Sequence, residues 1–286
     1  MNAYLLAALL GVVEGLTEFL PVSSTAHLRI CEALLHIDLG DGFWKMFSIV
    51  IQLGAILCLP IYFRARISEF FATFPKGKSG NHTALTHPLT LTIIAFLCTA
   101  IPAFLFTKII GKHLESVIIM GSALLIGGIV MWIVDVMFAD KGATDDMDKM
   151  SVGQAIWIGL CQVLSAVFPG TSRSMSTIAA GQLSGMTRAA ALEFSFFLSI
   201  PTMVVATCYD LLKTLRHKDE AGAALGVVHM DAHAWITLAI GFIVSFIVAY
   251  FVVAWFMKWV RTRGFVPFAV YRIVVGIAVL AWALKR

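Results

Sequence analysis

The chain has 286 residues, of which 59% are hydrophobic and 13% are charged, and its formal net charge is +4. Soluble domains usually carry about 25% charged residues, so the composition excludes an ordinary soluble domain and favours a protein embedded in a bilayer. No basic stripe with interleaved aromatic residues is present, which excludes a nucleic-acid partner. Five dispersed cysteines predict neither a disulfide framework nor a zinc site.

The first element in chain order is an apolar segment over 3–30 that polar side chains interrupt. Glu14 and Glu18 lie about 40° apart on one face of a helix. Each buried carboxylate costs roughly 2.5–3.5 kcal/mol on insertion scales, so a bound cation or a set of donors must compensate the pair. No Lys or Arg precedes the apolar run, and Glu14 lies within it. Both features argue against a secretory signal.

Six later segments are apolar and close to the roughly 20 residues that a helix needs to cross the hydrocarbon core. The segments 3–30 and 152–185 are also apolar, but Pro and polar clusters break them. Broken helices at membrane depth are tolerated where they line a cavity or are buried in protein. We therefore expect an all-α polytopic membrane protein with two re-entrant helical hairpins and six transmembrane helices, at 46–63, 89–107, 116–134, 189–212, 234–257 and 264–284.

The two broken segments resemble each other. In GVVEGLTEFLPVSSTAH (11–27) and GLCQVLSAVFPGTSRSM (159–175), Gly11 matches Gly159, Pro21 matches Pro169 and Ser24 matches Ser172 at one offset. We expect one membrane domain over 1–286 that contains a duplication, with halves of about 1–138 and 152–286. An acidic loop at 139–151 joins them and is predicted to be a solvated connector. An odd number of crossings in each half makes the repeat inverted.

Basic residues indicate the orientation. In this topology the loops 64–78 and 258–263, which are rich in Lys and Arg, fall on one face of the membrane. The positive-inside rule identifies that face as cytoplasmic. Both ends of the chain are then expected on the opposite side.

The two hairpins carry complementary chemistry. The first supplies the carboxylates of Glu14 and Glu18, which could hold Mg²⁺ or Ca²⁺. The second supplies Arg173, whose planar fork of donors suits phosphate. Together they predict a metal-assisted site for phosphoryl transfer, in which Ser24 and Arg173 contact one phosphate and an apolar groove leads toward lipid. The hydroxyls expected to assist in binding are those of Ser23, Thr25, Thr171, Ser172 and Ser174.

Each of these residues also has a purely structural interpretation. A lone His27 is commonly a hydrogen-bonded structural residue, and serines in membrane helices often bond back to a carbonyl. Arg173 could pair helices, and Glu193 and Arg272 could be a buried pair or separate polar anchors. The combination, rather than any single residue, favours a site.

The motif EGLTEFLPVSSTAH (14–27) closely resembles the first signature of the undecaprenyl-diphosphate phosphatase, or bacitracin-resistance, family. PGTSRS (169–174) resembles the second signature, and RAAALEFSFFLSIP (188–201) and VPFAVYR (266–272) are also similar to that family. The resemblance implies a bacterial inner-membrane enzyme whose site opens to the periplasm and needs a divalent cation. Its substrate would be the C55 isoprenoid diphosphate, from which it removes one phosphate to recycle the carrier for peptidoglycan. The resemblance leaves a homodimer open.

Carried over by position, the resemblance marks Glu14 and Glu18 as the acidic pair, Ser24 and His27 as nucleophile and base, and Arg173 as the phosphate clamp. Which of Ser24 and His27 attacks stays open. This chain has Ala26 and Met175 where the family's motifs usually have Gly, and Met175 would resist a positive φ. The competing function is a polyprenyl-phosphate transporter or flippase with the same phosphate site, although a carrier needs no nucleophile beside a base.

Overall fold

The computed structural model describes residues 2–37, 42–78, 80–106, 116–138, 141–216 and 231–285. Over these residues the chain is helical, apart from turns and one isolated bridge between Thr144 and Met186. Six helices of the described chain are long and apolar enough to cross a membrane, which confirms the predicted all-α membrane fold and all six predicted spans. They are α3 (Gly42–Tyr62), α5 (Pro88–Leu105), α7 (Val117–Phe138), α10 (Arg188–Arg216), α11 (Ala232–Arg263) and α12 (Val266–Ala283).

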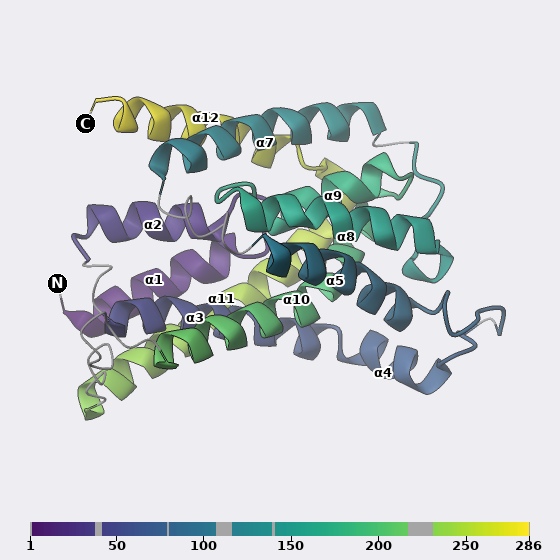
Figure 1. Cartoon of the computed structure of the whole chain (residues 1–286), viewed down its shortest axis with the longest axis horizontal. Coiled ribbons are helices and arrows are strands. Elements are labelled where there is room, and N and C mark those ends of the chain that lie inside the picture. Colours follow the sequence, from purple (N-terminus) through teal and green to yellow (C-terminus); the bar gives the residue numbers. More distant parts are fainter. Residues whose placement is uncertain are drawn as a thin grey trace.

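Each broken segment forms two shorter helices joined by a turn that contains a proline. The first comprises α1 (Ala3–Thr17) and α2 (Ser24–Leu34), and the second α8 (Val152–Val167) and α9 (Arg173–Leu183). A capping box between Ser151 and Gln154 starts α8. In Figure 1, α1 and α2 lie on the side of the N-terminus, and the two hairpin turns meet near the centre of the molecule.

Small residues allow the helices to approach closely. A Cβ on Gly11 of α1 would lie 2.7 Å from the carbonyl oxygen of Gly241 in α11. A Cβ on Gly159 of α8 would collide with the backbone of Ala95 in α5. α3 runs alongside α11 as well, because the Ser245 hydroxyl donates to the Ile51 carbonyl (2.7 Å). α1 thus packs on α11, whereas α8 packs on α5.

The basic segments lie at one end of the bundle. α3 and α11 run in the same direction, and Tyr62 near the end of α3 packs on Tyr250 of α11 (ring centroids 5.9 Å apart). The segment after α3, predicted as a loop, is the helix α4 (Arg64–Thr73). Figure 1 places both chain termini at the other end, away from α4.

The acidic connector 139–151 is not a simple solvated loop where the structure describes it, over 141–151. Residues 139–140 lie outside the described residues. Asp146 forms an ion pair with Arg66, which also contacts Asp148 (3.2 Å) and Glu193 (3.4 Å). Met147 is fully buried. The connector is therefore packed against the bundle, because its carboxylates neutralise the partly buried guanidinium of Arg66. The sequence pattern did not predict this pairing.

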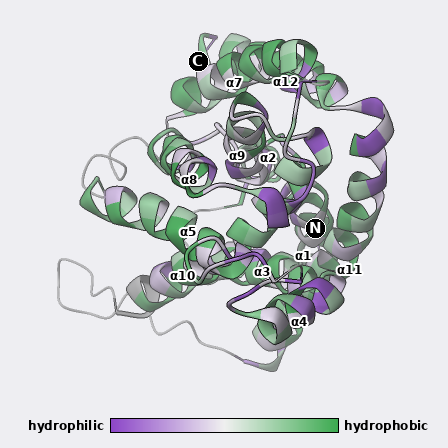
Figure 2. Ribbon diagram, turned by 90° about the vertical axis from the view of Figure 1, so that its right-hand side faces the viewer, coloured by the Kyte–Doolittle hydropathy of each residue, from purple (hydrophilic) through white to green (hydrophobic). Residues whose placement is uncertain are grey.

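Apolar side chains cover the outside of the bundle as well as its core. Figure 2 shows hydrophobic residues along most of the helical surface, with hydrophilic residues gathered mainly on α4 and the connecting segments. Exposed Phe104, Val136 and Ile126 belong to this surface. Such a continuous apolar exterior is typical of a protein surrounded by lipid rather than water.

Candidate active site

The two hairpin turns have the same unusual backbone. Ser23, which precedes α2, has φ 72°, and Ser172, which precedes α9, has φ 71°. A positive φ is uncommon for a serine and stores strain that is often found at functional sites. Gly170 also has a positive φ (94°), and a Cβ there would meet the Met120 backbone at 2.6 Å. The turns place the N-termini of α2 and α9, where a helix favours anions, beside each other.

Glu18 connects the two turns chemically. The Ser24 hydroxyl donates a short hydrogen bond to Glu18 Oε2. Glu18 Oε1 lies 3.5 Å from Arg173 Nη2, and both side chains are nearly buried. Ser24 and Arg173 thus share one carboxylate although half the chain separates them, as the prediction of one site built by both hairpins requires.

The Arg173 guanidinium is anchored on α10. Its Nη1 donates a short hydrogen bond to the Ser199 hydroxyl and a longer one, 3.4 Å, to the Ser195 carbonyl. The guanidinium carbon lies 5.9 Å from the centre of the Phe19 ring, a favourable cation–π arrangement. Nε and Nη2 of Arg173 have no hydrogen-bond partner among the described residues. Nε is therefore an available donor in a buried position, as an anion site requires, whereas Nη2 also faces Glu18 Oε1 at 3.5 Å.

Glu14 is fully buried, and neither of its carboxylate oxygens has a hydrogen-bond partner in the described chain. The charged groups that act on it include the carboxylates of Glu18 and Glu32. A buried acid with two unpaired oxygens beside a second buried acid, Glu18, fits a hard divalent cation. No cluster of three or more His, Cys, Asp or Glu side chains that could hold a metal occurs among the described residues. A cation here would need further oxygen ligands from hydroxyls, water or a phosphate.

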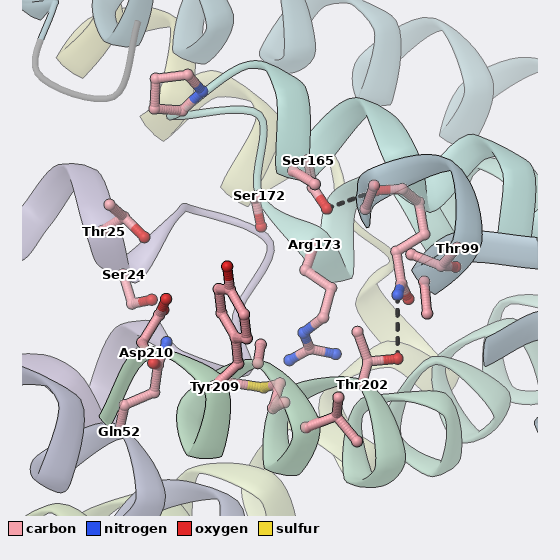
Figure 3. A pocket seen from close by; sticks show the side chains of 18 of the residues that line it. Ser24, Thr25, Gln52, Thr99, Ser165, Ser172, Arg173, Thr202, Tyr209 and Asp210 are labelled. Atoms are coloured by element: carbon pink, nitrogen blue, oxygen red, sulfur yellow. Dashed lines mark hydrogen bonds between the residues drawn. The ribbon is translucent and has the colours of Figure 1, made fainter. Parts of the chain in front are cut away.

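A cavity of about 570 Å³ lies between the turns, and the later parts of α5 and α10 form its other walls. Figure 3 shows Ser24 and Thr25 on one side and Ser172 and Arg173 on the other, with Tyr209 pointing in from α10. Glu18 and Ser23 also line the cavity. One wall is apolar, and its residues are Phe96, Ala100, Ala103 and Phe104 of α5 and Met203, Val205 and Ala206 of α10.

The structure does not bring His27 and Ser24 together. His27 Nδ1 lies 2.7 Å from the Ser23 carbonyl oxygen, and Nε2 lies 2.7 Å from the Tyr271 hydroxyl. The two rings also stack, with centroids 5.6 Å apart. Both ring nitrogens are thus engaged away from the Ser24–Glu18 pair, and His27 holds α2 against α12.

Two other predicted hydroxyl residues support the turns rather than line the cavity. Ser174 is buried, and its hydroxyl donates to the Leu20 carbonyl of the first turn (3.0 Å). It also lies 3.1 Å from the Ser172 hydroxyl. Thr171 offers its carbonyl to Arg272. The prediction that all five hydroxyl residues contact one phosphate therefore has geometric support only for Ser23, Thr25 and Ser172, which line the cavity.

The replaced family glycines are accommodated. Met175 lies in the first turn of α9, where its backbone is helical, and its side chain is buried. The positive φ values occur instead at Gly170 and Ser172. Ala26 is buried within α2. Neither position needs a glycine conformation in this chain.

Several cavity residues were missed because each is a single polar residue within an apolar span. Gln162 donates to the Thr202 hydroxyl (3.1 Å), and the Thr99 hydroxyl donates to the Gly159 carbonyl (2.7 Å). Ser195 and Ser199, four residues apart on one face of α10, were a readable signal for a partner of Arg173. The remaining missed lining residues are Gln52, Ser165, Tyr209 and Asp210.

Comparison with known proteins agrees with this geometry. Residues 7–278 match the model of the family described as bacitracin resistance protein BacA. A protein of Caldanaerobacter subterraneus named undecaprenyl-diphosphatase is 42% identical over 280 residues, covering 98% of this chain and 96% of its own length. Proteins with the same name from Rhizobium etli (40% identical, covering 98% of this chain and 97% of the relative) and Polaromonas naphthalenivorans (38%, covering 97% and 94%) are also similar. The chain therefore belongs to the bacitracin resistance protein BacA family.

Proposed function

We propose that this membrane enzyme hydrolyses undecaprenyl diphosphate to undecaprenyl phosphate and inorganic phosphate. The observation that carries the proposal is the carboxylate of Glu18, which binds the Ser24 hydroxyl and pairs with Arg173. The proposed nucleophile Ser24, the proposed base Glu18 and the phosphate-binding guanidinium of Arg173 thus lie together in a cavity with an apolar wall. The names of the relatives agree with this activity.

In the first step, Ser24 Oγ attacks the terminal phosphorus while Glu18 accepts the hydroxyl proton. The oxygen–phosphorus bond to Ser24 forms and the bridging P–O bond of the diphosphate breaks. Undecaprenyl phosphate leaves with the bonding electrons. Arg173 and the N-termini of α2 and α9 stabilise the charge on the transferring phosphoryl group.

In the second step, water attacks the phosphorus of the phosphoserine. Protonated Glu18 returns its proton to Ser24 Oγ as the serine–phosphate bond breaks. Both protons of the attacking water stay with the inorganic phosphate, which leaves as H₂PO₄⁻, and Glu18 is again a carboxylate. The cycle restores the Ser24–Glu18 hydrogen bond, which leaves His27 in a positioning role.

Glu14 and Glu18 would hold the divalent cation, either Mg²⁺ or Ca²⁺, that the unpaired Glu14 oxygens suggest. When bound, such an ion would neutralise phosphate charge and orient the diphosphate. Glu18 would then act both beside the ion and as the partner of Ser24. Removal of the ion should leave the negative charges of Glu14 and Glu18 without a cation to neutralise them.

The prenyl chain is proposed to leave the cavity along the wall formed by α5 and α10. Val205 and Phe104 line the cavity and are also exposed on the outer surface, so the wall continues toward lipid. A prenyl chain gains about 0.8 kcal/mol for each buried CH₂ group, which favours a route that never enters water. The lipid tail would therefore stay in the bilayer while the diphosphate reaches Glu18.

We infer further that the site faces the periplasm of a bacterial inner membrane. The cavity is built from the later parts of α5 and α10, and it extends toward the end of the bundle opposite the basic helix α4. The positive-inside rule would place α4 in the cytoplasm. This location suits an enzyme that recycles a lipid carrier for cell-wall synthesis and thereby confers bacitracin resistance.

The proposed architecture is an inverted repeat in which both hairpins are re-entrant. Reciprocal packing supports it, because α1 lies on α11 while its counterpart α8 lies on α5. The matching backbones of Ser23 and Ser172 support it as well. Pairing these two serines shifts the alignment of the two hairpin sequences by one residue at the turn. Ser24 then corresponds to Arg173 rather than to Ser172.

The decisive experiment is release of inorganic phosphate from undecaprenyl diphosphate by the purified protein in nanodiscs. We expect turnover that EDTA abolishes and that Mg²⁺ or Ca²⁺ restores. Ser24→Ala should eliminate turnover, and trapping of ³²P on the wild-type protein should locate the phosphoserine. Turnover by Ser24→Ala at the wild-type rate would overturn the assignment of the nucleophile.

The same purified protein, reconstituted into sealed vesicles, tests the transporter, which the comparisons do not favour. A carrier would move a fluorescent prenyl phosphate across the vesicle membrane without phosphate release. Absence of phosphate release together with such transport would replace the phosphatase proposal.

A further inference from the structure

Arg272 of α12 is fully buried and takes no part in the chemistry described above. Nη1 donates to the Pro21 carbonyl (3.1 Å). Nη2 lies 3.0 Å from the carbonyl oxygens of Ala123, Gly170 and Thr171. No carboxylate pairs with it among the described residues, where Arg272 is instead surrounded by backbone carbonyls.

These acceptors belong to the parts that must be aligned for the reaction. Pro21 lies in the turn before Ser24, and Gly170 and Thr171 lie in the turn before Arg173. Ala123 belongs to α7, which packs on α12. One guanidinium therefore ties both hairpin turns to the same helix pair.

The Thr171 contact also has a consequence for the orientation of an amide. In a trans peptide the carbonyl and the following N–H point in opposite directions. Because the Thr171 carbonyl faces Arg272, the N–H of Ser172 points away from Arg272. Ser172 lines the cavity, so this contact sets the direction of a backbone donor next to Arg173.

The helix that faces Arg272 provides room for it. A Cβ on Gly127 of α7 would collide with Nη2 of Arg272 and would lie 2.7 Å from the Met175 methyl group. A Cβ on the adjacent Gly128 would lie 3.1 Å from the Arg272 Cβ. These glycines leave space for the guanidinium where it reaches both turns.

We propose that Arg272 is a positioning residue that holds the two hairpin turns in register, so that Ser24 and Arg173 act on one phosphate. A purely space-filling role does not account for a buried charge, since an apolar side chain would fill the volume without desolvating a guanidinium. The inference rests on the proposed phosphatase function. It extends that function to a residue that contacts neither substrate nor cation.

The test compares Arg272→Lys with the wild type. Lysine keeps the charge but loses the fork that reaches several carbonyls. We expect kcat to fall about tenfold or more while KM changes by less than about threefold, because the loss falls on transition-state alignment. A near-wild-type kcat, or a change in KM alone, would overturn the proposal.

A double-mutant cycle separates positioning from general destabilisation. If Arg272 acts by aligning the Arg173 side, adding Arg272→Lys to Arg173→Lys should cost much less than it costs alone, less than about threefold. Fully additive losses would show that Arg272 acts independently of Arg173 and would refute the inference.

A glycine pair provides the second test, which needs no change at Arg272. Gly127→Ala should lower kcat because the new Cβ displaces the guanidinium. Gly121→Ala is the matched control on the same α7–α12 contact, since its Cβ would meet only the flexible side chains of Leu280 and Val279. Equal losses of kcat in both variants, at matched melting temperatures, would contradict the proposal.

Binding of inorganic pyrophosphate, followed as an increase in melting temperature, distinguishes this inference from the phosphatase itself. If the wild type binds pyrophosphate but releases no phosphate, the proposed function fails. In that case too, Arg272→Lys should change pyrophosphate affinity by less than about threefold, in line with the small change expected in KM, and a larger loss of affinity would refute the positioning role.

Discussion

The two hairpins share a backbone but differ in charge. Gly11 and Gly159 make the equivalent close contacts with α11 and α5, and Ser23 and Ser172 share a positive φ. The path from glycine to serine is one residue longer in the second hairpin, where Glu14 is replaced by Gln162 and Ser24 by Arg173. The comparison teaches that two hairpins of similar backbone can carry different parts of one proposed site: the acids and the proposed nucleophile lie on the first hairpin, and the proposed phosphate clamp lies on the second.

The helices beside the hairpins differ in the same way. α3 packs tightly on α11, where a Cβ on Gly54 would meet the Phe242 carbonyl at 2.6 Å. Their counterparts α10 and α5 diverge and form walls of the cavity. The cavity at the turns therefore lies on the side of α5 and α10.

Glu18→Gln should have the largest effect, because the Glu18 carboxylate contacts the proposed reactive side chains of both hairpins, Ser24 and Arg173. We expect kcat to fall about 10³-fold, within the range for loss of a general base. Glu193→Gln is the matched control, since Glu193 is also an acid paired with an arginine, Arg66, but lies outside the cavity. Comparable losses in both variants, measured as phosphate release, would contradict the role of Glu18.

Arg173→Lys tests the second hairpin. A point charge cannot replace the planar fork that spans Glu18, Ser199 and a phosphate, so kcat/KM should fall at least about tenfold, or ~1.4 kcal/mol. Arg188→Lys, at the pair with Asp135 (2.6 Å) outside the cavity, is the control. Near-wild-type kinetics for Arg173→Lys would reduce Arg173 to a generic charge.

Glu14→Gln makes the first hairpin resemble the second at this position, where Gln162 stands. We expect a weaker effect on kcat at saturating cation than for Glu18→Gln, and an apparent cation affinity lower by about tenfold, or ~1.4 kcal/mol. Titration of EDTA-treated protein with Mg²⁺ and Ca²⁺ measures it. An unchanged cation dependence in the Glu14→Gln, Glu18→Gln double variant would exclude both as ligands.

The smallest expected effect concerns the difference between the cavity wall of α5 and α10 and the tightly packed pair α3 and α11. Ala103→Trp on the α5 wall should raise KM for the C55 substrate roughly fivefold, or about 1 kcal/mol, by displacing part of the prenyl chain. A soluble short-chain prenyl diphosphate should be affected less. Val136→Trp, on the exposed face of α7, is the control, and equal changes for both chain lengths would argue against this route.

The sequence predicted the helices well because the bilayer imposes a simple rule. A span must be long, apolar and internally hydrogen-bonded, and each of the six spans satisfies that condition locally. The interruptions at Pro21 and Pro169 are equally local, so both broken segments were readable. The helix α4 was missed, because a short basic segment outside the apolar runs has no such signature.

The residues of the site were predictable where they form motifs and were missed where they occur singly. Glu18, Ser24 and Arg173 stand in dense polar clusters within apolar runs, which are costly and therefore informative. The four-residue spacing of Ser195 and Ser199 indicates a shared polar face of α10, but this signal was overlooked. Gln162 is an isolated polar residue, and nothing in a linear pattern indicates which helix it faces. The partner of Ser24 was misjudged for the same reason. His27 is three residues away on α2, but the turn before α2 folds so that the Ser24 hydroxyl binds Glu18.

By itself, the sequence determined the membrane class, the number of spans, the two broken segments and the reactive residue types. Hydropathy and polar interruption are properties of short segments, and they survive without knowledge of neighbours. Only the tertiary structure decided that Glu18 bridges Ser24 and Arg173, that His27 binds Tyr271, and that Arg272 holds both turns. Those contacts join residues up to 251 positions apart, and they depend on helix packing that no local pattern encodes.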